Sequence, residues 1–413
     1  MLDRKTPFIT EFSIYGLFGY KDLSLKFKNS VQIYIGENGF GKTTILNAFY
    51  YLLKGEYQKL NAIRFSKIKI VLGGQEFEFE KQILNNYCTS FKEKQRFFKS
   101  NLEEIELKEF GVFLNIKEQI KNSEYTLIYF PTYRRIEEEL KNLSEQYVNQ
   151  PLVVQQFQEG LMSNDKNLIQ FGMKDVEERI SKVLEKITSS SLTGFATISG
   201  EMIDEFLKDH IEEQQPPDFK PEEIQIVLSR MGDKISPQSK QFILDQIESQ
   251  NKEWSSNFYM VKFIQKLLNV YEKQKEWDTA IKRFSDTCNT YLSEKKFYYD
   301  ESAVTLTIYR EIAGELEFDE ENKIALKQLS SGEKQIVSII AQLYLEIDKR
   351  FIILIDEPEL SLSIYWQEKL LPDIMASERC NFMMAVTHSP FIFDNELKPY
   401  AIGLNEFLIN GKE

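Results

Sequence analysis

The chain has 413 residues, of which 42% are hydrophobic and 28% charged, so its composition is that of a soluble globular protein with more than one domain. No apolar stretch reaches the ~20 residues that cross a bilayer, and the N-terminus lacks the apolar core of a signal peptide, so we expect a cytoplasmic protein without membrane contact. The net charge of −13 argues against a surface dedicated to nucleic acid, and three scattered cysteines and two histidines argue against zinc and redox motifs.

The chain opens with strands, a glycine-rich turn and a helix. Within residues 8–35 apolar side chains alternate with polar ones, which indicates the strands of a half-buried sheet. After the turn the apolar residues recur at helical spacing, which predicts an amphipathic helix over residues 42–53. Residues 65–81 return to strands, with a hairpin turn at Gly73 and Gly74.

The turn between the third strand and this helix has the sequence GENGFGKT at residues 36–43, which fits the P-loop pattern G-x-x-x-x-G-K-[ST]. In such a loop, backbone N–H groups surround phosphates at a helix N-terminus. We expect Lys42 to reach the β- and γ-phosphates of ATP and Thr43 to coordinate Mg²⁺. A plain glycine turn is the alternative. The residues that we assign to nucleotide binding here are Gly36, Asn38, Gly39, Gly41, Lys42, Thr43 and Thr44.

The middle of the chain is predicted to be a helical insert over residues 136–291. Its pattern is rich in Glu, Gln and Lys, without the sustained heptads of a long coiled coil. Residues 204–223 carry eight acidic side chains against two basic ones. We therefore divide the chain into an N-terminal ATPase lobe (1–135), this insert, and a C-terminal ATPase lobe (292–413).

Two basic segments precede the insert, and each has two interpretations. Residues 91–99 interleave Lys and Arg with Phe, which suits a nucleic-acid contact or, more simply, a solvated hairpin. Arg134 and Arg135 follow an apolar strand at residues 125–130. They would touch a phosphate or a partner, or merely begin a solvated helix.

Strands at residues 296–299 and 304–310 lead to the sequence LSSGEKQ at residues 329–335, which opens a helix that extends to about residue 346. Ser330 and the amide of Gly332 stand at the start of this helix, where partial positive charge favours an anion. An N-capped helix without a ligand is the alternative, because serine is a favoured cap.

Two continuous apolar runs, at residues 351–355 and 382–386, are typical of parallel strands buried on both faces. The first run ends in two carboxylates, Asp356 and Glu357. We assign Asp356 to the coordination of Mg²⁺ and Glu357 to the orientation or deprotonation of the attacking water. A core strand that merely ends in an acidic turn is the alternative.

The P-loop, the LSSGEKQ signature and the acidic strand end occur in the order of ABC-type ATPases of the SMC/RecF-like branch, which this sequence resembles. The resemblance implies an α/β P-loop ATPase head with a helical insertion domain. It also implies that Ser330 and Gly332 cap the γ-phosphate of ATP bound to a second copy, so that a homodimer, or a higher oligomer, completes the site. His388 would then be the switch histidine that contacts the γ-phosphate, with a purely structural histidine as the alternative.

Two features of that family are incomplete in this chain. The Q-loop glutamine has no secure position, since Gln58, Gln75 and Gln82 are all candidates. Many relatives carry a histidine near position 363, in the D-loop region, where this chain has Ser363.

The chain resembles the overcoming-lysogenization-defect and AAA15 group of defence ATPases, and within it the ATPase subunits of PARIS anti-phage systems. The resemblance lies in the segments ENGFGKTTILNAFYYLL, YFPTYRRIE, LSSGEKQ, DEPELSLSIYWQ and THSPFIF. That resemblance implies an oligomeric ATPase that senses a phage-encoded trigger and controls a separate effector, a Toprim-type nuclease. The segment after His388 is too short for a nuclease domain, so we expect the effector to be another chain.

Two alternatives of other classes remain. One is a RecF-like ATPase of DNA repair or recombination, which would bind DNA strongly at low salt. The other is a nucleotide-locked structural protein with negligible turnover, against which Glu357 argues. The long gap between the P-loop and the signature disfavours a transporter subunit.

Overall fold

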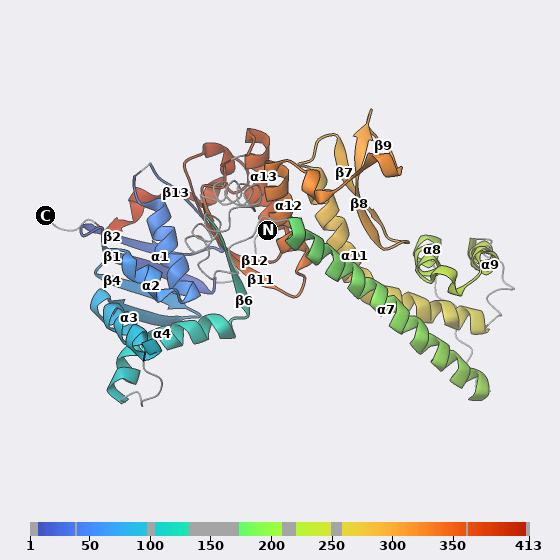
Figure 1. The fold of residues 1–413 in the computed structure, drawn as a ribbon, viewed down its shortest axis with the longest axis horizontal. Helices are drawn as coiled ribbons and strands as arrows, with labels where there is room; N and C mark the ends of the chain where they lie inside the picture. The colour runs from blue at the N-terminus through green and yellow to red at the C-terminus, as the bar shows by residue number, and fades with distance from the viewer. Residues whose placement is uncertain are drawn as a thin grey trace, which may run out of the picture. The chain divides into compact units, whose positions relative to one another are not determined.

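The computed structural model describes residues 7–37, 39–96, 104–131, 173–208, 220–248, 258–360 and 362–409. It divides into two compact units, of which the first combines Met1–Gln170 with Asp348–Glu413 and the second is Phe171–Ile347 (Figure 1). The first unit therefore unites the two ends of the chain. None of the described helices is long and apolar enough to cross a lipid bilayer.

The first unit contains an antiparallel and a parallel sheet, so the predicted α/β class is confirmed. The antiparallel sheet is formed by β1 (Ile9–Leu17), β2 (Lys21–Lys26), β4 (Lys67–Leu72), β5 (Gln75–Glu80) and β14 (Leu408–Ile409). The parallel sheet is formed by β3 (Val31–Ile35), β6 (Tyr125–Phe130), β11 (Arg350–Asp356), β12 (Cys380–Thr387) and β13 (Ala401–Gly403). The strand orders are β14-β2-β1-β4-β5 and β13-β3-β12-β11-β6.

Strands β11 and β12 are neighbours in the middle of the parallel sheet. Residues 351–355 are at most 2% exposed and residues 382–386 are fully buried, as their continuous apolar runs predict. Because β3, β11 and β12 run in the same direction, their carboxyl ends meet at one edge of the sheet. In open α/β sheets this edge is where ligands bind.

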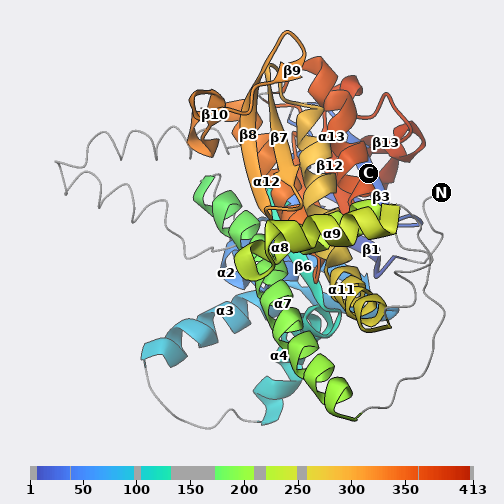
Figure 2. The ribbon, with the colours of Figure 1, turned by 90° about the vertical axis from the view of Figure 1, so that its right-hand side faces the viewer.

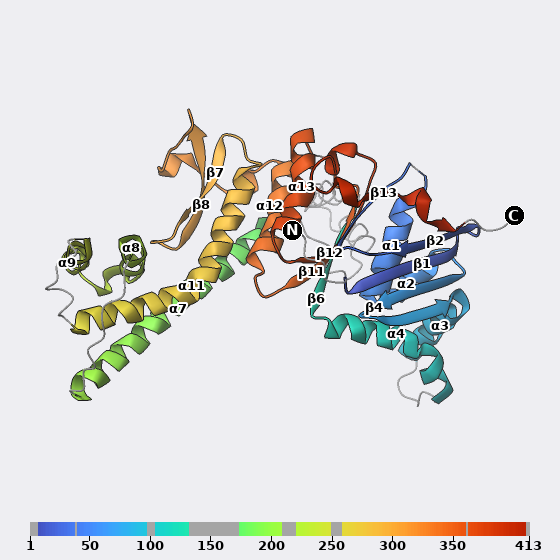
Figure 3. The ribbon, with the colours of Figure 1, turned by 180° about the vertical axis from the view of Figure 1, so that it is seen from behind.

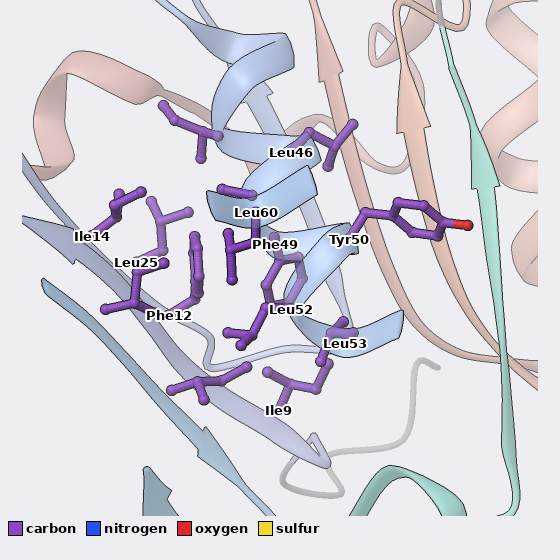
Figure 4. Close-up of a cluster of buried hydrophobic side chains, with 14 of the residues drawn as sticks. Ile9, Phe12, Ile14, Leu25, Leu46, Phe49, Tyr50, Leu52, Leu53 and Leu60 are labelled. Atoms are coloured by element: carbon purple, nitrogen blue, oxygen red, sulfur yellow. The ribbon is translucent and has the colours of Figure 1, made fainter. Parts of the chain in front are cut away.

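Helix α1 (Lys42–Lys54) lies between the two sheets and packs against both. The Phe49 ring lies 4.8 Å from that of Phe12 in β1, and the Tyr50 ring lies 4.6 Å from that of Tyr129 in β6. Figure 4 shows Phe49 and Leu52 turned toward β1, while Tyr50 points to the opposite side. This packing holds the N-terminus of α1, and with it the P-loop, at the edge of the parallel sheet.

Three further helices extend this core over β4 and β5, and the sequence pattern did not predict them (Figure 3). They are α2 (Tyr57–Ala62), α3 (Lys81–Arg96) and α4 (Glu104–Asn122). The Phe113 ring of α4 lies 4.8 Å from that of Tyr57 and 4.9 Å from that of Phe79. The interpretation of residues 91–99 as a solvated hairpin is wrong for residues 91–96, because α3 continues through them.

The second unit is built on two long helices that lie side by side, α7 (Met173–Lys208) and α11 (Phe258–Asn289) (Figure 1). Two shorter helices pack on them through an apolar cluster, α8 (Pro221–Arg230) and α9 (Pro237–Glu248) (Figure 2). The described part of the insert is thus helical, as predicted. Much of the acidic segment at residues 204–223 lies outside the described residues.

Four strands and a helix complete this unit: β7 (Lys295–Asp300), β8 (Thr305–Ile312), β9 (Glu315–Leu316), β10 (Lys323–Ile324) and α12 (Ser331–Leu345). Helix α12 packs on α7 and α11. For this reason the division of the structure falls between Ile347 and Asp348, whereas the domain boundary proposed from the sequence lies between residues 291 and 292.

The remaining helices are short, apart from α13 (Ile364–Ala376) in the first unit. The 3₁₀ helices are η1 (Gly232–Lys234), η2 (Glu320–Asn322), η3 (Leu326–Gln328), η4 (Pro390–Ile392), η5 (Lys398–Tyr400) and η6 (Leu404–Phe407).

A buried ion pair ties α8 to α11 in the second unit. Arg230 Nη2 lies 2.6 Å from Asp278 Oδ1, and the two side chains are 2% and 3% exposed. Arg230 also donates to Gln274 Oε1 at 2.7 Å, and the hydroxyl of Tyr299 donates to Asp278 at 2.5 Å. Burial, followed by the charge of Asp278, raises the pKa of Tyr299. The two charges are therefore paired within the unit through Asp278 Oδ1, while Asp278 Oδ2 is buried and has no hydrogen-bond partner among the described residues.

Candidate functional site

The P-loop predicted at residues 36–43 connects the carboxyl end of β3 to α1. Gly39 and Gly41 have φ values of 84° and 97°, in the left-handed region that glycine adopts without strain. A Cβ atom on Gly41 would lie 2.7 Å from the ring of Phe18. Among the described residues no side chain caps α1, so its first N–H groups remain available to an anion.

Two further members of the predicted site are Thr44 and Asn38. Thr44 lies half-buried in the first turn of α1. Asn38 lies outside the described residues.

Lys42 is the cation at the centre of the site, and its side chain is 5% exposed. Its ammonium donates to the carbonyl oxygens of Gly36 at 2.7 Å and Glu37 at 3.4 Å. It also lies 3.3 Å from Glu357 Oε1. The P-loop cation and the proposed catalytic carboxylate, more than 300 residues apart in sequence, are therefore in contact.

Thr43 and Asp356 meet at the same sheet edge. The Thr43 hydroxyl donates to Asp356 Oδ1 at 3.2 Å, and Asp356 is fully buried at the end of β11. A hydroxyl and a carboxylate are oxygen ligands of the kind that Mg²⁺ prefers. The two residues assigned to the metal from sequence therefore form a donor set that fits this ion.

Glu357 follows β11 directly, and its backbone has φ +49°. A non-glycine residue in this region costs about 1–3 kcal/mol, and such strain is concentrated at functional sites. Burial alone would raise the pKa of Glu357, but its hydrogen bonds with Glu359 and His388, together with the charge of Lys42, hold that pKa below the ordinary value. The side chain is thus a carboxylate at neutral pH, as a base or a water-orienting group must be.

His388, which follows β12, faces two carboxylates. Its Nδ1 lies 2.6 Å from Glu357 Oε2 and 3.0 Å from Glu359 Oε1. Because both neighbours are acceptors, we assign a proton to Nδ1. The side chain is 49% exposed, so its Nε2 is the ring nitrogen that a ligand would meet.

Glu359 is a site residue that the sequence did not reveal. Its Oε2 accepts from the hydroxyl of Thr387 at 2.7 Å, and its Oε1 accepts from the amides of His388 at 3.1 Å and Ser389 at 3.2 Å. Burial and the adjacent Glu357 raise the pKa of Glu359, against the opposing effect of Thr387 and the backbone amides. The only signal in the sequence was a second carboxylate two positions after Glu357.

Ligand atoms of Glu357, Glu359 and His388 all lie within 4.8 Å of one another, a spacing that could hold a cation. The oxygens of Glu359, however, already accept three hydrogen bonds from the protein. The geometry therefore fits a hydrogen-bonded cluster better than a set of metal ligands.

The signature residues Ser330 and Gly332 belong to the second unit, at the start of α12. Ser330 Oγ accepts from the amide of Glu333 at 3.4 Å, while Glu333 Oε2 accepts from the amide of Ser330 at 2.8 Å. Lys295 donates to the same carboxylate oxygen at 3.1 Å. This reciprocal arrangement is a capping box, so the N-capped helix is present, and the role of Ser330 and Gly332 toward phosphate stays a prediction.

The structure also places the three candidates for the Q-loop glutamine and Ser363 of the D-loop region. Gln58 Nε2 donates to the carbonyl of Cys88 at 3.4 Å, and Gln75 accepts from Gln119 at 2.9 Å. Gln82 lies in α3. Ser363 caps α13, where its hydroxyl accepts from the amide of Trp366 at 3.3 Å.

The structure does not describe the side chains of the two basic segments that the sequence suggested as contacts for phosphate, nucleic acid or a partner. Arg134 and Arg135 lie outside the described residues. The side chains of residues 91–99 do so as well.

Residues 8–393 match the family model AAA_15, an AAA ATPase domain. Among solved structures, the chain is similar to the Smc head domain with an extended coiled coil bound to the C-terminal domain of ScpA from Pyrococcus furiosus, with 11% identity, a TM-score of 0.38, and coverage of 94% of this chain and 91% of that one. It is also similar to an SmcHead bound to the C-winged helix domain of ScpA, with 10% identity, a TM-score of 0.37 and the same coverage. No curated protein matches the chain.

Proposed function

Since the chain belongs to the AAA_15 family of AAA ATPase domains, we propose that it binds ATP with Mg²⁺ and hydrolyses it to ADP and phosphate. The observation that carries this proposal is the contact of residues from the two ends of the chain. Thr43 meets Asp356 at 3.2 Å, and Lys42 meets Glu357 at 3.3 Å.

Each side chain has one role in this proposal. The N-terminus of α1 and Lys42 hold the β- and γ-phosphates, while Thr43 and Asp356 hold Mg²⁺. The bound ion neutralises charge on the phosphates. Glu357 orients the attacking water and accepts its proton, and His388 contacts the γ-phosphate through Nε2.

The experiment is a measurement of Mg²⁺-dependent ATP hydrolysis and of the binding of a fluorescent ATP analogue. Lys42→Ala is expected to abolish both, because its ammonium is the principal point charge on the phosphates. Lys28→Ala is the matched control, since Lys28 is an exposed lysine of the same unit, and it should behave as the wild type. Unchanged binding and hydrolysis in Lys42→Ala would refute the proposal.

We further propose that a second copy of the chain completes each site. Support comes from the location of the P-loop and the signature in different units, and from the resemblance to ATPases that share their sites between subunits. Large apolar side chains are also exposed on the segments around Glu359 and His388, as an interface between copies requires. These are Leu360 (41% exposed), Ile364 (53%), Tyr365 (56%) and Phe391 (40%).

For its biological role, we propose a cytoplasmic switch of an anti-phage system, similar to the ATPase subunits of PARIS systems. It would respond to a phage-encoded trigger and control a separate effector, a Toprim-type nuclease. Support comes from the amino-acid sequences of the motifs, which resemble those of the defence ATPases. The acidic stretch at residues 204–223 would attract a basic partner to the helical insert, because complementary charge accelerates association.

A pull-down from the native host tests this role against a RecF-like function in DNA repair. A defence switch should retain a nuclease chain in resting cells and release it after phage challenge. Recovery of the protein alone in both conditions, together with DNA binding that weakens steeply with salt, would favour the repair ATPase.

A further inference from the structure

A buried carboxylate, Glu359, joins the ends of two neighbouring strands, and the roles proposed for Lys42, Thr43, Asp356 and Glu357 do not require it. Its side chain is only 6% exposed. It lies three residues beyond the end of β11, while the groups that it binds belong to Thr387, the last residue of β12, and to the two residues that follow it. Burying a carboxylate is costly unless it is hydrogen-bonded, so both of its oxygens require donors from the surrounding protein.

Both oxygens of this carboxylate accept hydrogen bonds from one segment, residues 387–389. The Thr387 hydroxyl donates to Oε2 at 2.7 Å, and the amides of His388 and Ser389 donate to Oε1 at 3.1 and 3.2 Å. The Ser389 hydroxyl in turn donates to Gln367 Oε1 at 2.8 Å, which connects the loop to α13. The loop that carries His388 is therefore held from two sides.

This arrangement fixes the two groups that would act on the reaction. His388 Nδ1 is held 3.0 Å from Glu359, which leaves it 2.6 Å from Glu357 Oε2. The other oxygen of Glu357 lies 3.3 Å from Lys42. The Glu357 carboxylate has a defined orientation, because one of its oxygens contacts His388 and the other contacts Lys42. Glu359 contributes to this orientation, since it holds His388 in place.

We propose that Glu359 is a positioning residue for hydrolysis: it clamps residues 387–389 and thereby sets the orientation of His388 and of the Glu357 carboxylate. The inference rests on the proposed ATPase function and adds a residue that acts through others. A clamp of this kind contributes more to the rate of the chemical step than to the binding of ATP. Although it orients His388, it does not contact Lys42 or the N-terminus of α1, which hold the β- and γ-phosphates in the proposed function.

The test compares Glu359→Ala, Glu359→Gln and the wild type in ATP hydrolysis, in binding of the fluorescent ATP analogue and in thermal unfolding. Alanine removes all the hydrogen bonds, and misplacement of reacting groups by about 1 Å costs on the order of 10²-fold in rate. Glutamine has the same shape and one carbonyl oxygen for the two amides, so it should fold as the wild type and lose a smaller factor. In both variants we expect kcat to fall while nucleotide affinity changes little.

Glu118→Gln is the matched control. Glu118 is an exposed residue of α4 in the same unit, so this variant removes one negative charge without touching the clamp. Its kcat should equal that of the wild type.

Wild-type kcat in Glu359→Gln would overturn the inference if Glu359→Ala fails to fold, because the role would then be structural. Wild-type kcat in both variants would overturn it as well, as would equal losses of kcat and nucleotide affinity. These outcomes differ from failure of the proposed function, in which the wild type itself does not hydrolyse ATP; the inference then falls with that function, since there would be no reaction to position.

Discussion

At the scale of single residues, the site depends on carboxylates that the fold holds in costly positions. Asp356 is fully buried, and Glu357 combines burial with a left-handed backbone. Each is compensated by a partner from the P-loop, Asp356 by Thr43 and Glu357 by Lys42. The strain and the burial are consistent with selection for chemistry rather than for stability.

The role of Glu357 predicts the behaviour of its isosteric variant. Glu357→Gln should bind the fluorescent ATP analogue as tightly as the wild type but hydrolyse ATP more slowly by ~10²–10⁴-fold, the usual contribution of a general base. Glutamine keeps the shape and removes the proton acceptor. Wild-type turnover in this variant, measured by phosphate release, would show that another group is the base.

At the scale of secondary-structure elements, the second unit is held together by a charged network in its interior. Arg230 of α8, Asp278 of α11 and Tyr299 of β7 form this network with side chains almost inaccessible to solvent. Removal of one partner from a buried pair leaves an uncompensated charge. The attachment of α8 to α11 should therefore be sensitive to a single substitution.

Arg230→Met is expected to lower the free energy of unfolding of the second unit by roughly 3–5 kcal/mol, because Asp278 then remains buried without its cation. Lys275→Ala is the control. Lys275 pairs with Glu272 on the same helix α11 and with Glu223 of α8, and the three side chains are 47%, 55% and 22% exposed. Lys275 therefore also links α8 to α11, but at the surface, where loss of an ion pair costs little.

Denaturant unfolding measures both effects. A Trp366→Phe background removes the tryptophan of the first unit, so the remaining fluorescence reports on Phe171–Ile347. Equal stability of the Arg230→Met and Lys275→Ala proteins would show that the buried network contributes no more than a surface pair.

At the scale of the whole molecule, the proposed site is shared between copies. Lys42→Ala and Ser330→Arg proteins should each be inactive, yet their mixture should recover activity. Each heterodimer contains one intact site, so random pairing restores at most about a quarter of wild-type hydrolysis.

A mixture of Lys42→Ala with Glu357→Gln is the control, because both residues belong to the first unit of the same copy and neither site of that heterodimer is intact. This mixture should stay inactive. Absence of recovery in the first mixture, with both proteins folded and paired, would contradict the shared arrangement.

The sequence alone was sufficient where the information is local. The strands and α1 follow from apolar periodicity, and the P-loop and the Asp356–Glu357 pair from consecutive residues at the junction of a strand with the next element. A parallel sheet then brings these junctions to one edge, because its carboxyl ends coincide. The α/β fold and the identity of the nucleotide-site candidates could therefore be predicted.

Only the tertiary structure decided features that depend on contacts between distant segments. Helices α2, α3 and α4 were missed, and α12 was assigned to the C-terminal lobe although it packs with α7 and α11. Glu359 was missed because a glutamate after a strand is usually solvated. Its burial requires three hydrogen-bond donors from residues 387–389. No local pattern encodes that requirement, because the donors come from the end of a different strand.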